Sequence, residues 1–221
     1  MAKDERGVAE RSEPAAAWQG AFGDAYSARN QSSEASLASR ARLFSRVLQV
    51  APLGSGARIL EVGTNVGMNL AALARVGAFA LHGVDLNRGA LGTLRGDPTL
   101  AGRARVAQAR AEHLPFADRS MDLVFTCGVL IHVPPECLAD ACREIVRVSG
   151  RYVLCAEYFS PRPEEIEYRG QRGLLFKRDF GAFFLDSCPE LTVLDYGFFW
   201  RHFEFDDFNW WLLEKRGTAS L

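Results

Sequence analysis

The sequence Ala57-Arg58-Ile59-Leu60-Glu61-Val62-Gly63-Thr64-Asn65-Val66-Gly67-Met68-Asn69-Leu70 decides the fold of this 221-residue chain. It begins as a short apolar run with β-branched residues, is interrupted by glycines, and continues as an alanine- and leucine-rich helical pattern. This order predicts a buried strand, a tight turn and the start of a helix. Glycines in such a turn let the backbone approach a ligand closely, and the helix N-terminus behind them offers unpaired N–H groups.

Two classes of nucleotide-binding site begin in this way. A dinucleotide site has Gly-x-Gly-x-x-Gly after the strand, whereas this turn has Gly63-x-Asn65-x-Gly67. The acidic residue Glu61 stands two places before the first glycine. That arrangement resembles the first motif of class I methyltransferases, acidic-x-Gly-x-Gly-x-Gly, with asparagine at the middle glycine. The turn alone leaves both classes open.

Composition narrows the class of protein. A chain with 48% hydrophobic residues can bury the core of one α/β domain, and a net charge of −1 argues against general nucleic-acid binding. No apolar run approaches the roughly 20 residues of a membrane helix, and the N-terminus lacks the apolar core of a signal peptide. The five cysteines have no disulfide-framework spacing. We therefore expect a cytoplasmic protein without a membrane or nucleic-acid partner.

The N-terminal region divides into a tail and an arm. Residues 1–16 are charged and alanine-rich, which predicts a mobile tail. The stretch from Trp18 to Asn30 is dense in aromatic residues and allows two interpretations, a packing arm over the domain edge or a lid over a cofactor. A helical pattern from Glu34 to Val50 follows. We expect residues 17–56 to form this arm and helix as a cofactor lid.

The rest of the chain alternates between strand and helix patterns. Helices are expected at 66–75, at 88–95 and after Pro134, and residues 158–185 are expected to be irregular. Strands are expected at 57–62, 78–84, 104–108, 122–128 and 152–156, with an antiparallel pair at 192–200 and 208–214. The sequence thus predicts an α/β, Rossmann-like, mostly parallel seven-stranded sheet with an antiparallel C-terminal hairpin and helices on both faces. Residues 57–221 would form this domain, with an acceptor-site insertion at 158–190.

Ligands of such sheets bind beyond the carboxyl ends of the strands. Asp85 ends the second strand, where a carboxylate can accept both ribose hydroxyls, although a surface aspartate is the simpler alternative. The stretch Ala111-Glu112-His113-Leu114-Pro115-Phe116, followed by Asp122-Leu123-Val124, closely resembles a methyltransferase pattern that dehydrogenases lack. Arg110 departs from that pattern, which usually has an aspartate facing the adenine amine there.

Further motifs narrow the resemblance. Gly128-Val129-Leu130-Ile131-His132-Val133, Tyr168-Arg169-Gly170 and Leu175-Phe176-Lys177-Arg178-Asp179-Phe180 are similar to the pseudaminic acid biosynthesis-associated methyltransferases, as are Glu61–Leu70 and the Trp18–Asn30 arm. The resemblance implies S-adenosylmethionine as cofactor, S-adenosylhomocysteine as product, and a polar small-molecule acceptor. We expect a monomer or homodimer. The residues expected to bind the cofactor are Trp18, Tyr26, Arg29, Glu61, Gly63, Thr64, Asn65, Gly67, Asp85, Leu86, Arg110, Ala111, Glu112, Cys127 and Gly128, with Arg29 or Tyr26 near the methionine carboxylate.

The acceptor must lose a proton, so a base is expected near the methyl group. His132, Glu157 and Tyr158 follow strands at the expected opening, although each suits a structural role as well. Tyr168, Arg169 and Lys177 belong to a cluster that either recognises the acceptor or forms a solvated surface. The four histidines are scattered, so no metal is expected.

Two other functions stay open. An NAD(P)-dependent Rossmann oxidoreductase is disfavoured by Asn65 and by the 111–116 stretch. A non-catalytic partner protein with the methyltransferase fold is kept open by Arg110.

Overall fold

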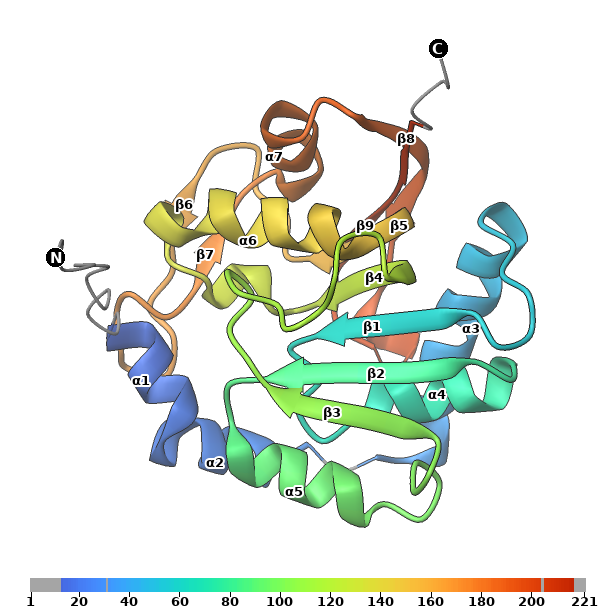
Figure 1. Cartoon of the computed structure of the whole chain (residues 1–221). Coiled ribbons are helices and arrows are strands. Elements are labelled where there is room, and N and C mark those ends of the chain that lie inside the picture. The colour runs from blue at the N-terminus through green and yellow to red at the C-terminus, as the bar shows by residue number, and fades with distance from the viewer. Residues whose placement is uncertain (1–12, 31, 204, 217–221) are drawn as a thin grey trace, which may run out of the picture.

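A computed structural model describes residues 13–30, 32–203 and 205–216, in which seven strands form one sheet (Figure 1). The strand order is β3-β2-β1-β4-β5-β9-β8. Neighbours pair in parallel from β3 to β5, whereas β9 pairs antiparallel with both β5 and β8. The strands are β1 (Arg58–Val62), β2 (Ala80–Asp85), β3 (Ala104–Gln108), β4 (Met121–Cys127), β5 (Ser149–Glu157), β8 (Leu191–Phe198) and β9 (Asn209–Lys215). The predicted mostly parallel sheet with a C-terminal hairpin is confirmed.

Helices cover both faces of the sheet. On one face, α3 (Glu34–Val50), α4 (Met68–Val76) and α5 (Arg88–Gly96) contribute buried side chains to one core cluster. On the other face, α6 (Pro135–Val148) and α7 (Phe180–Ser187) build the second cluster. The chain therefore has the three layers of a doubly wound α/β domain.

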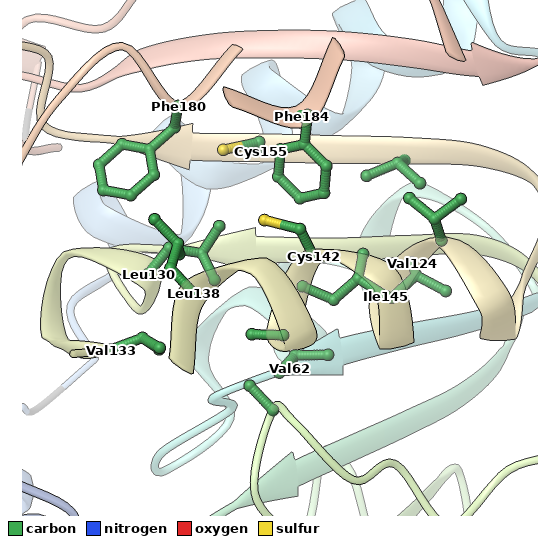
Figure 2. Close-up of a cluster of buried hydrophobic side chains, with 14 of the residues drawn as sticks. Val62, Val124, Leu130, Val133, Leu138, Cys142, Ile145, Cys155, Phe180 and Phe184 are labelled. Atoms are coloured by element: carbon green, nitrogen blue, oxygen red, sulfur yellow. The ribbon is translucent and has the colours of Figure 1, made fainter. Parts of the chain in front are cut away.

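The second core cluster shows why α6 and α7 dock on the sheet. Leu138, Cys142 and Ile145 lie on one stripe of α6, and Phe180 and Phe184 come from successive turns of α7 (Figure 2). All five are at most 2% exposed. Burying a large apolar side chain contributes about 1.5–3 kcal/mol, so these residues fix both helices against β4 and β5.

The N-terminal region differs from expectation in two respects. The aromatic arm is helical, with α1 (Glu13–Gln19) and α2 (Ala21–Ser27), so the last residues assigned to the tail belong to a helix. The remainder of the predicted tail, residues 1–12, lies outside the described residues. Helix α3 belongs to the core rather than to a lid, because Phe44 is 1% exposed and its ring centroid lies 5.2 Å from that of Phe125.

The segment predicted to be irregular contains regular structure. It holds a short hairpin, β6 (Glu164–Glu165) with β7 (Phe176–Lys177), and helix α7. Helix α7 was missed because its sequence is dominated by phenylalanine. Its N-cap was readable, since the Asp179 carboxylate accepts a hydrogen bond from the Ala182 N–H at 2.9 Å.

Short 3₁₀ turns complete the path at Leu130–His132 (η1) and Arg201–Phe203 (η2). None of the helices in the described part of the chain combines the length and apolarity needed to cross a membrane.

Candidate active site

A cavity of about 500 Å³ opens at the carboxyl ends of β1, β2 and β4. Strand order reverses at β1, which is flanked by β2 and β4, so the cavity occupies the switch point where ligands of this architecture bind. Helices α1 and α2 and the β6–β7 hairpin lie at this arrowhead end of the parallel strands (Figure 1). The volume of the cavity is typical of small-molecule sites.

The turn between β1 and α4 forms one wall. Gly63, Asn65 and Gly67 have left-handed backbone angles, with φ of 79°, 47° and 87°. A Cβ on Gly63 would lie 2.2 Å from a methyl carbon of Val129, so only glycine fits there. Gly67 does not line the cavity, contrary to the predicted contact. A Cβ at Gly67 would lie 2.8 Å from Leu94, and its role is to let α4 begin close to α5.

Glu61, near the end of β1, holds this turn in place through hydrogen bonds. Its buried carboxyl accepts hydrogen bonds from the Thr64 hydroxyl at 2.8 Å and from the Asn69 amide at 2.7 Å. Burial raises the pKa of Glu61 to about 8. The side chain lines the cavity and also orders the loop that forms its wall.

Asp85 projects from the end of β2 into the cavity wall. Its two carboxylate oxygens accept the backbone N–H groups of Asn65 and Asn87, each at 2.7 Å. Burial raises the pKa of Asp85, and the N–H groups partly offset that effect. The carboxylate is thus held in one orientation, with lone pairs left for further donors.

The arm is tied to this wall. The Asn87 amide donates to the Trp18 carbonyl at 3.2 Å and to the Asp24 carboxylate at 2.8 Å. The Trp18 ring centroid lies 4.3 Å from that of His132, and the Phe22 ring lies 6.1 Å from that of Tyr168. Helices α1 and α2 therefore contact both the N-terminus of α5 and the β6–β7 hairpin, which is called the acceptor-side hairpin below.

Buried polar atoms without a protein partner mark the cavity. They are the Nε1 of Trp18, the Nε of Arg40 and the Oδ1 atoms of Asn65 and Asn69, all from lining residues. A buried polar atom without a partner costs about 1–3 kcal/mol. Four such atoms in one cavity indicate that a polar ligand belongs there.

Arg110 and Glu112 form an ion pair on the adenine side of the predicted site, at 2.8 Å. Both residues line the cavity, as do Leu86 and Ala111. The Arg110 charge is therefore balanced by its neighbour, so the departure from the methyltransferase pattern leaves the site neutral at this point.

Glu157 does not lie in the site, and its predicted role as a base is wrong. Its carboxylate is fully buried, does not line the cavity, and accepts backbone N–H groups from Val129, Leu130 and Ile131 at 3.2, 3.1 and 3.4 Å. Burial raises its pKa to about 7. Glu157 holds the loop after β4 in place.

His132 and Tyr158 do line the cavity. The Nδ1 of His132 lies 2.5 Å from the Leu174 carbonyl oxygen, which can only accept, so Nδ1 carries the proton. Burial lowers the pKa of His132 to about 4, so the imidazole is neutral at pH 7. The Tyr158 hydroxyl donates a hydrogen bond to the Asp206 carboxylate. Burial raises the pKa of Tyr158 most, and the hydrogen bond to Asp206 raises it further.

The predicted acceptor residues are only partly brought together. Tyr168 and Arg169 line the cavity, whereas Lys177 does not, and its ammonium lies 5.3 Å from the centre of the Tyr158 ring. Arg169 and Gly170 have φ of 53° and 74° between the bridged residues Tyr168 and Gln171. This is the two-residue hairpin turn that places Arg169 at its tip.

Sequence reasoning missed Arg40, Asp206 and Phe208, which all line the cavity. Arg40 lies in α3, which was predicted from the spacing of its apolar residues, and that spacing does not indicate a role for its polar side chains. Asp206 and Phe208 lie in the connection between β8 and β9, and only the sheet order shows that this loop returns to the site. All other predicted cofactor residues except Gly67 line the cavity. Among the described residues, no group of His, Cys, Asp and Glu side chains is arranged to hold a metal ion.

The chain is similar to known proteins in both sequence and fold. A family described as a methyltransferase domain matches residues 59–150. Methyltransferase GfsG of Streptomyces halstedii is 30% identical over 110 residues, or 48% of this chain and 39% of that protein. An uncharacterised protein of Haemophilus influenzae is 33% identical over 94 residues, or 41% of this chain and 38% of that protein. The matches thus span about two fifths of these relatives.

Among solved structures, magnesium protoporphyrin IX methyltransferase of Synechocystis PCC 6803, with bound S-adenosylmethionine, superposes with a TM-score of 0.69. The alignment covers 94% of this chain and 99% of that one at 12% identity. The strand order, the position of the cavity and this structural similarity all indicate the same fold. The chain has the Rossmann-like fold of class I methyltransferases.

Proposed function

We propose that this protein is an S-adenosylmethionine-dependent methyltransferase acting on an oxygen or nitrogen atom of a polar small molecule. One observation carries the proposal. The Asp85 carboxylate, the left-handed glycine turn and four unpartnered buried polar atoms converge on one cavity at the switch point of the sheet. These groups suit a ligand that combines ribose hydroxyls, a zwitterionic amino acid and a planar base.

Each part of the cofactor would be bound by different lining residues. Asp85 would accept the ribose hydroxyls, and the peptide groups at Gly63 would face the amino-acid part. The guanidinium of Arg40, whose Nε lacks a protein partner, would bind the methionine carboxylate. Leu86, Ala111 and the Arg110–Glu112 pair would flank the adenine. Arg29, which the sequence pattern assigned to the carboxylate, is more exposed than Arg40 and lies beyond Tyr26.

The cofactor, when bound, supplies an electrophilic methyl group on a sulfonium centre. The chain must then orient the acceptor, exclude water and receive a proton. Helices α1 and α2 would close the opening through the contacts of Trp18 with His132. Asp206, an exposed carboxylate on the cavity wall, would take the acceptor proton and release it to solvent. Tyr158, which donates to Asp206, would hold it in position.

The motifs shared with pseudaminic acid biosynthesis-associated methyltransferases support a polar acceptor such as a sugar or a natural-product intermediate. The five cysteines, which lack disulfide-framework spacing, support a cytoplasmic location. A monomer or homodimer stays a prediction. Nothing in the cavity favours a nicotinamide dinucleotide, because Asn65 replaces the glycine that a dinucleotide turn has at this point.

The first prediction tests the cofactor assignment by calorimetric titration with S-adenosylhomocysteine. The wild-type protein should bind one equivalent with micromolar affinity. Asp85→Ala should bind about 10- to 150-fold more weakly, because it loses charge-assisted hydrogen bonds worth about 1.5–3 kcal/mol. Asp186→Ala, an exposed acidic residue of α7 away from the cavity, is the matched control and should bind like wild type.

Equal affinity in Asp85→Ala and wild type would show that the ribose lies elsewhere. Transfer of tritium from methyl-labelled S-adenosylmethionine to a polar metabolite fraction then separates an enzyme from a non-catalytic partner protein. Binding without any transfer would contradict the catalytic part of the proposal.

A further inference from the structure

Resting on the proposed methyltransferase function, we propose that the acceptor carries an anionic group, a carboxylate or a phosphate, bound between Arg29 and Arg169. These residues come from the C-terminal end of the arm and from the tip of the acceptor-side hairpin. They stand outside the assignments made for the cofactor, which uses Arg40 deeper in the cavity.

Arg29 and Arg169 come from neighbouring parts of the cavity lining, because Arg169 interacts electrostatically with Tyr26 of α2 as well as with Tyr168. Arg29 follows α2, where its backbone N–H donates to the Tyr26 carbonyl at 3.1 Å. Arg169 occupies the tip of a two-residue turn, with its guanidinium 5.4 Å from the centre of the Tyr168 ring. Phe22 of α2 packs edge-on against Tyr168, which joins the arm to the hairpin. Both arginines line the one cavity.

Neither arginine has an acidic partner in the part of the chain that the structure describes. No salt bridge there involves Arg29 or Arg169, and the side chain of Arg169 is hydrogen-bonded to that of Tyr168 instead. The acidic groups of the cavity are already engaged: Glu112 pairs with Arg110, Asp85 accepts backbone N–H groups, and Glu61 accepts Thr64 and Asn69. Asp206, which also lines the cavity, accepts the Tyr158 hydroxyl.

Two lining guanidinium groups, those of Arg29 and Arg169, are thus without an ion-pair partner among the described residues. An anion between them would gain charge-assisted hydrogen bonds, because guanidinium binds carboxylate or phosphate oxygens through paired N–H donors. The hydroxyls of Tyr26 and Tyr168, which line the same end, can donate to an anion as well. Such a group would also bridge arm and hairpin, so that binding of the acceptor would close the cavity over the reacting atoms.

The test uses two probe anions, pyrophosphate for phosphate chemistry and succinate for carboxylate chemistry. Each is titrated calorimetrically into the full-length protein saturated with S-adenosylhomocysteine, at constant ionic strength. One of the two should bind with a dissociation constant in the millimolar range or below. Arg29→Ala and Arg169→Asn should each weaken that binding by about tenfold or more, while affinity for S-adenosylhomocysteine stays within about twofold of wild type. Asparagine is chosen at position 169 because it tolerates the left-handed backbone.

Arg172→Asn is the matched control, since Arg172 is an exposed arginine of the same hairpin that does not line the cavity. It should bind the probe like wild type. Absence of binding by both anions, or binding that survives loss of Arg29 and Arg169, would overturn the inference. Failure of S-adenosylhomocysteine itself to bind would instead contradict the proposed function, so the two failures are distinguishable.

Discussion

At the scale of single residues, two arginines, Arg29 and Arg40, are candidates to bind the methionine carboxylate of the cofactor. The sequence pattern favours Arg29, whereas the structure gives Arg40 a buried Nε without a protein partner beside the β1–α4 turn. The Arg40 guanidinium also lies 5.0 Å from the centre of the Phe205 ring, which holds it toward the cavity. A cation that is already desolvated binds a carboxylate more strongly than an exposed one.

We therefore predict that Arg40→Ala weakens S-adenosylhomocysteine binding by about 10- to 150-fold, while Arg29→Ala changes it by less than about twofold. Arg42→Ala is the control, because Arg42 lies on the side of α3 that faces Asp195 of β8 rather than the cavity. Calorimetry measures all three. If Arg29→Ala weakened binding more than Arg40→Ala, the methionine carboxylate would lie at the mouth of the cavity. Arg29 would then bind the cofactor and could not bind the acceptor.

Glu61 should give the protein a characteristic pH dependence. Its pKa is about 8 in the folded protein, because burial disfavours the charged form, and about 4.3 in an unfolded chain. The folded state therefore holds the proton more tightly, and the stabilisation this gives is lost as pH rises toward 8. Glu157 acts in the same direction up to about pH 7, and His132, with a pKa near 4, acts oppositely at lower pH.

Substitution isolates the Glu61 contribution. Glu61→Gln cannot ionise and keeps one oxygen for Thr64 or Asn69. Between pH 6 and 9 the free energy of unfolding of the wild type, without cofactor, should fall by about 1–3 kcal/mol relative to the variant. Urea unfolding followed by tryptophan fluorescence measures the difference. Parallel pH curves for the two proteins would show that Glu61 is ionised in the folded state.

At the scale of elements, the arm is the part whose removal should affect binding but not folding. No residue of α1 or α2 belongs to either core cluster. The arm is instead attached by Asn87 and by the ring contacts of Trp18 and Phe22. Its contribution is to the cavity wall, through Trp18, Tyr26 and Arg29.

Deletion of residues 1–30 should therefore leave cooperative unfolding intact and weaken S-adenosylhomocysteine binding by about tenfold or more, since the cavity loses one wall. Trp18→Phe, which keeps an apolar ring but removes the indole N–H, should have a smaller effect. Denaturant titration and calorimetry together measure both properties. Unchanged affinity in the truncated protein would make the arm a packing element alone.

At the scale of the whole molecule, the sequence predicted those features that depend on local pattern. The strand-turn-helix at Arg58–Val76 was readable because apolar periodicity, glycine positions and the acidic residue before the turn agree. Asp85 lies at the cavity, as the sequence predicted, because the carboxyl ends of the parallel strands meet at the edge of the sheet where the cavity opens. The mostly parallel sheet with its antiparallel hairpin followed from the alternation of strand and helix patterns and from the two strand patterns at the C-terminus.

Features that depend on contacts distant in sequence could not be predicted. Glu157 ends a strand, as a catalytic residue would, and only the three-dimensional path of the loop at Val129–Ile131 shows that its carboxylate is consumed by backbone N–H groups. Arg40 and Asp206 reach the cavity from α3 and from the β8–β9 connection, neither of which carries a local motif. Helix α7 was hidden because buried phenylalanines suit strands as well as helices.

A crystal structure of the protein with S-adenosylhomocysteine tests the central claim most directly. The proposed function predicts the product in the cavity, with both ribose hydroxyls at hydrogen-bond distance from Asp85, the methionine carboxylate on Arg40 and the adenine beside Ala111. A cavity that stays empty at saturating ligand, or a ligand that does not touch Asp85, would contradict it.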